Sequence, residues 1–113
     1  MTAQSDTQES VGTRSEAAAS TLRPRLWRVL LHNDDYTTRD FVVMVLMRYF
    51  HRTHTEATQV MLHVHTKGRG IAGIYPHDVA RTKVAQTEQV ARQQQMPLKL
   101  TMEPDDDGHE EDV

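Results

Sequence analysis

The stretch LWRVLLHNDDYTTRDFVVMVLM, residues 26–47, decides the fold. Its first six residues, LWRVLL, are apolar except for Arg28. Both faces of a strand formed by them would be apolar, which is typical of a buried strand. Residues 33–36, NDDY, interrupt this pattern with residue types that favour loops. Thr37-x-x-Asp40 then resembles a capping box, with Asp in place of the stronger Glu or Gln, and predicts a helix that runs to about Phe50.

Two more helices and two more strands are expected after this unit. They are, in order, a helix opened by the capping box Thr53-x-x-Glu56 and ended by Gly68, a strand over residues 70–75, a helix from Pro76 to about Gln94, and a strand with Leu98, Leu100 and Met102 on its buried face. The order is therefore β-α-α-β-α-β. It predicts an α/β protein, a small α/β sandwich in which a three-stranded sheet packs against three helices.

Composition divides the 113 residues into three segments. Residues 1–21 are rich in Ser, Thr, Gln and Ala and have almost no large apolar residues, so we expect a disordered N-terminal arm. Residues 22–103 contain twelve of the thirteen Lys and Arg residues and form the folded domain. Residues 104–113 are dominated by Asp and Glu, which predicts an acidic, disordered tail.

The residues present argue against an enzyme and against a membrane protein. There is no cysteine, and all serines lie within residues 1–21, which excludes thiolate sites and makes a Ser-His-Asp arrangement implausible. His63 and His65 are two residues apart on a predicted helix and point about 200° apart, so they cannot clamp one ion. We therefore expect no metal and no cofactor. No run of about 18 apolar residues and no secretory signal is present, so we expect a cytoplasmic location.

Two binding functions remain after these exclusions. Residues 22–102 carry a net charge of +6, which favours a small basic nucleic-acid-binding domain with an acidic regulatory tail. The run FVVMVLM at residues 41–47 has more apolar surface than one core stripe needs. It belongs either to a helix buried between layers or to the side of a hydrophobic groove. An acidic loop leads into it, which suits a cationic group attached to an apolar one and favours a peptide-binding module.

Three phrases of the sequence, in this order, resemble one family. They are VLLHNDDYT at residues 29–37, ATQVMLHVH at 57–65 and DVARTKV at 78–84. The family is ClpS, the adaptors that deliver N-degron substrates to a Clp AAA+ unfoldase–protease, and the resemblance covers roughly residues 25–103. It implies that the three strands are antiparallel. It also implies an adaptor, not an enzyme, that binds the free N-terminal residue of a substrate when that residue is bulky and hydrophobic or aromatic.

The resemblance implies a site for this first residue. Its α-amino group is held by Asn33, Asp35 and His65, while Asp34 adds negative potential. Its side chain enters a hydrophobic pocket lined by Leu31, Thr37, Val42, Met61, Val64 and Leu98. An α-ammonium is a cation with three hydrogen-bond donors, so a set of acceptors in a negative field suits it.

Two pocket positions depart from the family pattern. Arg39 stands at the rim where Met is common, and His32 stands where an aliphatic residue is usual. A guanidinium stacks on aromatic rings but would lose water without compensation over Leu, so we expect Arg39 to favour Phe, Tyr and Trp over Leu. Alternatively, Arg39 pairs with Asp35 or Asp40 and leaves selectivity untouched.

The implied partner is the N-terminal domain of a ClpA-type or ClpC-type unfoldase. The resemblance places part of the docking surface on the third helix, at Asp78 and Lys83. It gives the arm, residues 1–21, a role in the hand-off of substrate to the motor. We expect a monomer with neither nucleic acid nor a membrane as partner.

Overall fold

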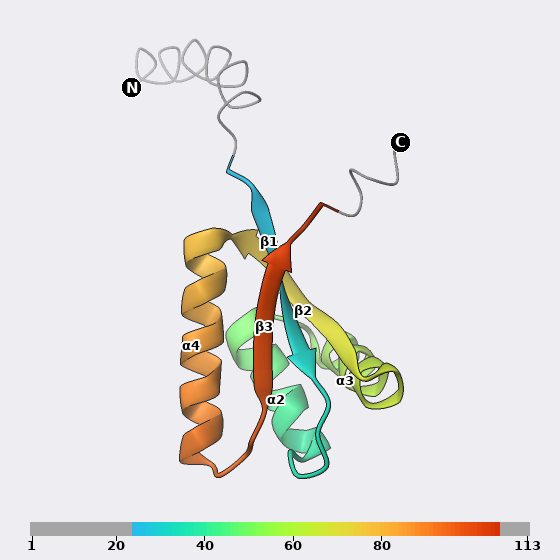
Figure 1. Ribbon diagram of the computed structural model, residues 1–113. Helices are drawn as coiled ribbons and strands as arrows, with labels where there is room; N and C mark the ends of the chain where they lie inside the picture. Colours follow the sequence, from blue (N-terminus) through green and yellow to red (C-terminus); the bar gives the residue numbers. More distant parts are fainter. Residues whose placement is uncertain (1–23, 107–113) are drawn as a thin grey trace, which may run out of the picture.

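The computed structural model describes residues 24–106 and has the predicted order of elements. The elements are β1 (Leu26–His32), α2 (Arg39–Phe50), α3 (His54–Lys67), β2 (Arg69–Pro76), α4 (His77–Gln93) and β3 (Lys99–Pro104). The strands form one antiparallel sheet in the order β2-β1-β3 (Figure 1). The predicted fold class is confirmed. The predictions of disorder for residues 1–21 and for residues 107–113 lie outside the described part of the chain.

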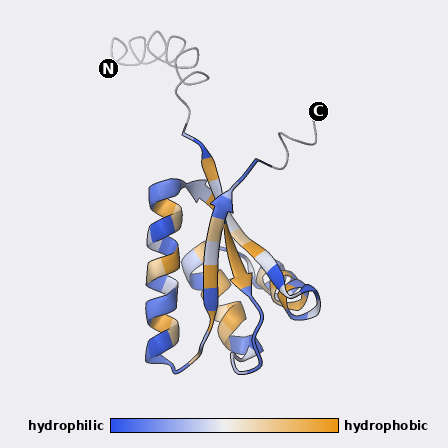
Figure 2. Ribbon diagram, viewed as in Figure 1, coloured by the Kyte–Doolittle hydropathy of each residue, from blue (hydrophilic) through white to orange (hydrophobic). Residues whose placement is uncertain are grey.

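One hydrophobic cluster joins the sheet to the three helices. Side chains alternate between the two faces of a strand, and the fully buried Val29 and Leu31 of β1 both point to the helices. From α4, Ala80 and Ala91 join the same cluster. The narrow core stripe of α4 is visible in Figure 2 as thin hydrophobic bands on a mostly hydrophilic helix.

The apolar run of α2 is mostly buried. Val45 and Leu46 are fully buried, and only Met47 is well exposed, at 39%. The helix contacts α3, α4 and β2, which explains how so much of its circumference is covered. These contacts favour the interpretation of a helix buried between layers.

The residues predicted to begin and end the helices are partly confirmed. The capping box Thr53-x-x-Glu56 is confirmed, and Gly68 ends α3 in the left-handed conformation at φ 98°, which favours glycine. The predicted cap of α2 is wrong by one residue, because the Thr38 hydroxyl, not that of Thr37, accepts from the Phe41 N–H.

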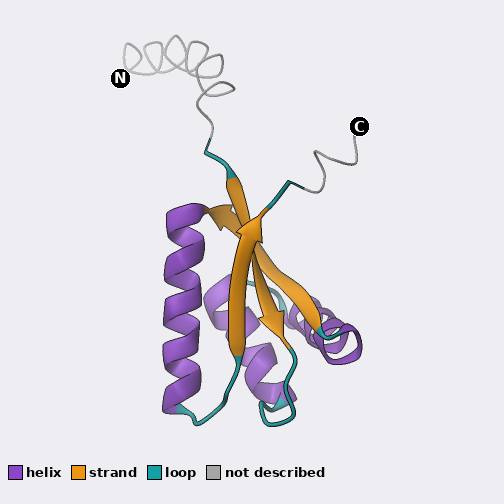
Figure 3. Cartoon of the chain, viewed as in Figure 1, coloured by secondary structure: helices purple, strands orange, loops and turns teal. Residues whose placement is uncertain are grey.

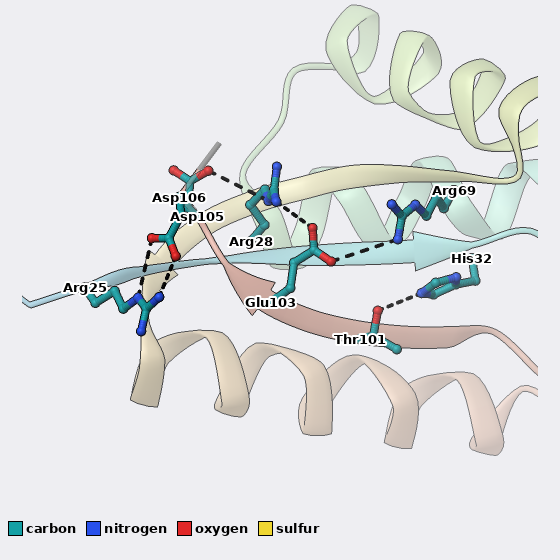
Figure 4. A network of polar contacts seen from close by, with 8 residues as sticks. All are labelled: Arg25, Arg28, His32, Arg69, Thr101, Glu103, Asp105 and Asp106. Carbon is teal, nitrogen blue, oxygen red and sulfur yellow. Dashed lines mark hydrogen bonds and ion pairs between the residues drawn. The ribbon is translucent and has the colours of Figure 1, made fainter. Parts of the chain in front are cut away.

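The first residues of the predicted acidic tail belong to the sheet. β3 continues through Pro104, and the Asp105 N–H donates to the Leu26 carbonyl at 2.8 Å. The mostly buried Arg28 guanidinium lies 3.8 Å from the Asp105 carboxylate and 2.6 Å from that of Glu103 (Figure 4). Arg25 pairs in the same way with Asp106. The sheet therefore extends past the boundary predicted at residue 103, and arginines in and just before β1 pair with acids in and just after β3.

Candidate functional site

The strand register brings three distant segments to one end of the sheet. His32, the last residue of β1, pairs with Arg69 at the start of β2 and with Lys99 at the start of β3. The loop after β1, the end of α3 and the residue before β3 therefore meet at this end, as Figure 3 shows for the loops. The Asn33 N–H donates to the Gly68 carbonyl at 2.9 Å and fixes the loop to the end of α3.

Asp34 organises this loop. One of its carboxylate oxygens accepts from the N–H groups of Tyr36 and Thr37 at 2.8 and 2.7 Å, and the other accepts from the Thr37 hydroxyl at 2.7 Å. Burial raises the pKa of Asp34, but the hydrogen bonds from the Thr37 hydroxyl and the two N–H groups outweigh it, so the net pKa lies below the ordinary value. Asp34 keeps its negative charge and uses its oxygens to hold the turn. The same bonds occupy Thr37, which leaves Thr38 to cap α2.

The other predicted polar residues lie on the surface around this loop. Asn33 and Asp35 are exposed, and among the described residues neither side chain has a hydrogen-bond partner. His65, also exposed, lies in the last turn of α3, and the Arg39 guanidinium lies 2.9 Å from its Nε2 atom. A guanidinium has only donors, so Nε2 accepts and the imidazole proton is on Nδ1. The Nε2 lone pair of His65 thus accepts a hydrogen bond from Arg39.

Arg39 pairs with neither of the two acids that the sequence offered as its partners. The guanidinium bonds to neither Asp35 nor Asp40 but to His65, on a different helix. Arg39 is the first residue of α2, and His65 lies in the last turn of α3, two residues before its end. The contact therefore bridges the ends of the two helices that were predicted to line the pocket.

Most of the predicted apolar lining residues belong to the hydrophobic core of the domain. Leu31, Val42, Val64 and Leu98 are buried members of one cluster, and Met61 packs against it half-buried. Thr37, which is half-buried, lies at the edge of the loop. No separate cavity is found among residues 24–106. The apolar groups expected to receive a side chain are thus part of, or packed against, one hydrophobic core, apart from Thr37 at its edge.

The assignment of His32 to the pocket is wrong. His32 follows Leu31 in β1, so the two side chains lie on opposite faces of the sheet, and Leu31 takes the face that packs on the helices. The His32 Nε2 atom lies 2.7 Å from the Thr101 hydroxyl on the neighbouring strand (Figure 4). Burial, Lys99 and Arg69 lower the pKa of His32, against the opposing effect of Glu103.

The two residues predicted for docking differ in their availability. The Asp78 side chain, in the first turn of α4, is 96% exposed. The Lys83 ammonium donates to the Tyr49 carbonyl of α2 at 2.7 Å and lies 5.5 Å from the centroid of the Tyr75 ring. Lys83 therefore holds α4 against α2, whereas Asp78 projects into solvent.

Between residues 24 and 106, no cluster of three or more His, Asp or Glu side chains is arranged to hold a metal ion. No helix in that part of the chain combines the length and the apolar character needed to span a membrane.

Comparisons with known proteins agree with the resemblance. The family model described as ATP-dependent Clp protease adaptor protein ClpS matches residues 22–101. The chain is similar to the ATP-dependent Clp protease adapter protein ClpS of Myxococcus xanthus, with 52% identity over 97 residues, covering 86% of this chain and 91% of that relative. It is 50% identical over 96 residues to the corresponding protein of Deinococcus radiodurans, covering 85% of each chain.

One solved structure combines the same fold with a bound ligand. It is Agrobacterium tumefaciens ClpS2 bound to L-phenylalaninamide, which matches with a TM-score of 0.71 and 35% identity, covering 74% of this chain and all of that one. None of these similar proteins is a nucleic-acid-binding domain, and that alternative is not supported.

Proposed function

Because this chain belongs to the ClpS family of adaptors of the ATP-dependent Clp protease, we propose that it binds the free N-terminal residue of N-degron substrates and delivers them to a Clp AAA+ unfoldase. An adaptor of this kind is not an enzyme. The observation that carries the proposal is the exposed acceptor set Asn33, Asp35 and His65 above a cluster of apolar side chains. L-Phenylalaninamide, the ligand of the similar ClpS2, combines a free α-amino group with an aromatic side chain.

The α-amino group would bind to the three acceptors. Asn33 offers its side-chain carbonyl, Asp35 a carboxylate and His65 the lone pair of Nε2, which together match the three N–H donors of an ammonium. Asp34 supports them indirectly, since its hydrogen bonds shape the loop that carries Asn33 and Asp35. Hydrogen bonds that involve charged groups contribute about 1.5–3 kcal/mol each, so this set is sufficient to select a free amine.

The side chain of the first residue would enter between α2 and α3. Leu31, Val42, Val64 and Leu98 would form the apolar floor, and Met61 and Thr37, both half-buried, would lie nearer to the entrance. Binding a large side chain there would involve repacking of the side chains at the entrance. Met61 suits this role, because a methionine side chain is unbranched and flexible and can repack around an aromatic ring.

Delivery requires a surface for the motor, and we place it around Asp78. Its neighbour Val79 is 42% exposed, so α4 offers a carboxylate beside an apolar group at its first turn. The partner would be the N-terminal domain of a ClpA-type or ClpC-type unfoldase, met by a monomeric adaptor in the cytoplasm, where ATP is available to the motor. The arm, residues 1–21, would then engage the motor, and degradation assays on a chain without the arm test this role.

Reversing the charge of Asp78 is expected to separate docking from substrate binding. Asp78→Lys should slow degradation of a Phe-starting reporter by the Clp protease at least threefold, because the Asp78 carboxylate is proposed to contact the motor. The affinity for peptides should stay unchanged. The control is Gln59→Lys, which adds a lysine at an exposed position of α3 that has no proposed contact with the motor. Equal degradation rates for Asp78→Lys and the wild type would remove Asp78 from the docking surface.

The function is tested with short peptides that differ only in their first residue. Peptides starting with Phe, Tyr or Trp are expected to bind with micromolar or lower Kd, and otherwise identical peptides starting with Asp or Gly at least tenfold more weakly. Burying one large apolar side chain contributes about 1.5–3 kcal/mol, which supports this ratio. Isothermal titration measures it. Binding that ignores the first residue and falls steeply with salt would instead indicate a nucleic-acid type of charged surface.

A further inference from the structure

The bridge between Arg39 and His65 lies on the side of α2 and α3 that carries the predicted pocket residues. Arg39 precedes Val42 by three residues in α2, and Met61 precedes His65 by four in α3. Residues three or four apart share one face of a helix. The 2.9 Å contact from the guanidinium to Nε2 therefore joins the two helices on the side where the predicted pocket residues lie.

We propose that Arg39 is an internal competitor for the α-amino site, a latch that substrate must displace. In the free protein its guanidinium donates to Nε2 of His65 the hydrogen bond that the α-ammonium of a substrate would donate. Both groups are cations that only donate, and one lone pair on an imidazole serves one of them at a time. This inference rests on the proposed function and adds a regulation of the same site.

A latch and a filter at the pocket rim predict different effects of Arg39 on peptide affinity. The bond that must be broken is the same for every substrate, so the latch reduces the affinity of all first residues by one common factor. That factor is the reciprocal of the fraction of molecules in which His65 is free. A rim filter, as the sequence predicted for Arg39, instead changes the ratio of Leu to Phe affinity.

Arg39→Met is the variant that opens the latch. It removes the guanidinium and keeps a flexible side chain with good helix propensity. Because Arg39 is exposed and is the first residue of α2, its loss removes no core contact and relieves a positive charge at the positive end of the helix dipole. Arg39→Gln provides a second variant with a polar side chain.

The matched control is Arg48→Met. Arg48 is an exposed arginine of the same helix, in its last turn, so this change removes an equal charge without touching His65. Isothermal titration with Phe-starting and Leu-starting peptides compares the four proteins in low salt and in 1 M NaCl, where the Debye length is only about 3 Å.

We expect both Arg39 variants to bind both peptides about three- to tenfold more tightly than the wild type, by the same factor for Phe and Leu, and at both salt concentrations. Arg48→Met should bind like the wild type. Unchanged affinity, a gain confined to the Leu peptide, or a gain that vanishes in 1 M NaCl would each overturn the latch. A wild-type protein that binds neither peptide would instead contradict the proposed function, so the two failures are distinguishable.

Discussion

Acetylation of the α-amino group of a Phe-starting peptide is expected to weaken its binding at least a hundredfold. The acetylated nitrogen is neutral and keeps one donor, so at least two of the acceptors Asn33, Asp35 and His65 lose their partners. Hydrogen bonds to charged groups contribute about 1.5–3 kcal/mol each, and two of them amount to at least about 3 kcal/mol. Each 1.4 kcal/mol is a factor of ten in Kd, which gives the hundredfold loss.

The control for this experiment is a peptide acetylated on a lysine side chain far from its first residue. It carries the same added group and the same loss of one charge, but keeps the α-amino group, so its affinity should match that of the unmodified peptide. Isothermal titration of the three peptides provides the comparison. If the peptide with the blocked α-amino group binds as tightly as the other two, recognition does not depend on the N-terminus.

Local signals in the sequence predicted the elements well where nothing competed with them. Thr53 and Glu56 cap α3 as expected, because both partners of a capping box lie within one turn. At the start of α2, the cap was predicted at Thr37, and the adjacent Thr38 takes that role. The Thr37 hydroxyl donates a hydrogen bond to the Asp34 carboxylate instead. This bond depends on the conformation of the loop, which the spacing of residues in the sequence does not reveal.

The site residues divide in the same way. Asn33 and Asp35 follow a strand directly, so their position at one end of the sheet was predictable from the order of the elements. The contact from Arg39 to His65 joins residues 26 apart in sequence and depends on how the ends of α2 and α3 pack. His32 was assigned to the pocket from the family resemblance, and because β1 continues through His32, the alternation of side chains along the strand places it on the face opposite to Leu31.

Removing either of two predicted acceptors is expected to reduce affinity for Phe-starting peptides at least tenfold without unfolding the domain. Asp35→Ala deletes a carboxylate, and His65→Ala deletes the Nε2 lone pair, each a loss of about 1.5–3 kcal/mol of interaction with the α-ammonium. Both side chains are exposed, so the free energy of unfolding should change by no more than about 0.5 kcal/mol. Asp40→Ala, which removes another exposed carboxylate from the neighbouring turn, is the charge control and should change affinity less than threefold.

The loss at His65 should also depend on Arg39. In the wild type, substrate forms the hydrogen bond to Nε2 only after displacing the guanidinium. The net contribution of His65 to substrate affinity, which His65→Ala removes, is therefore reduced by the cost of that displacement. In the Arg39→Met background the lone pair is free, so His65→Ala should reduce affinity more than it does in the wild type. The extra loss should equal the factor by which Arg39→Met alone increases affinity. Titration of the wild type, the two single variants and the double variant measures this coupling. Equal losses in the two backgrounds would mean that Arg39 and substrate do not compete for His65. A wild-type affinity in His65→Ala itself would remove this residue from the α-amino site altogether.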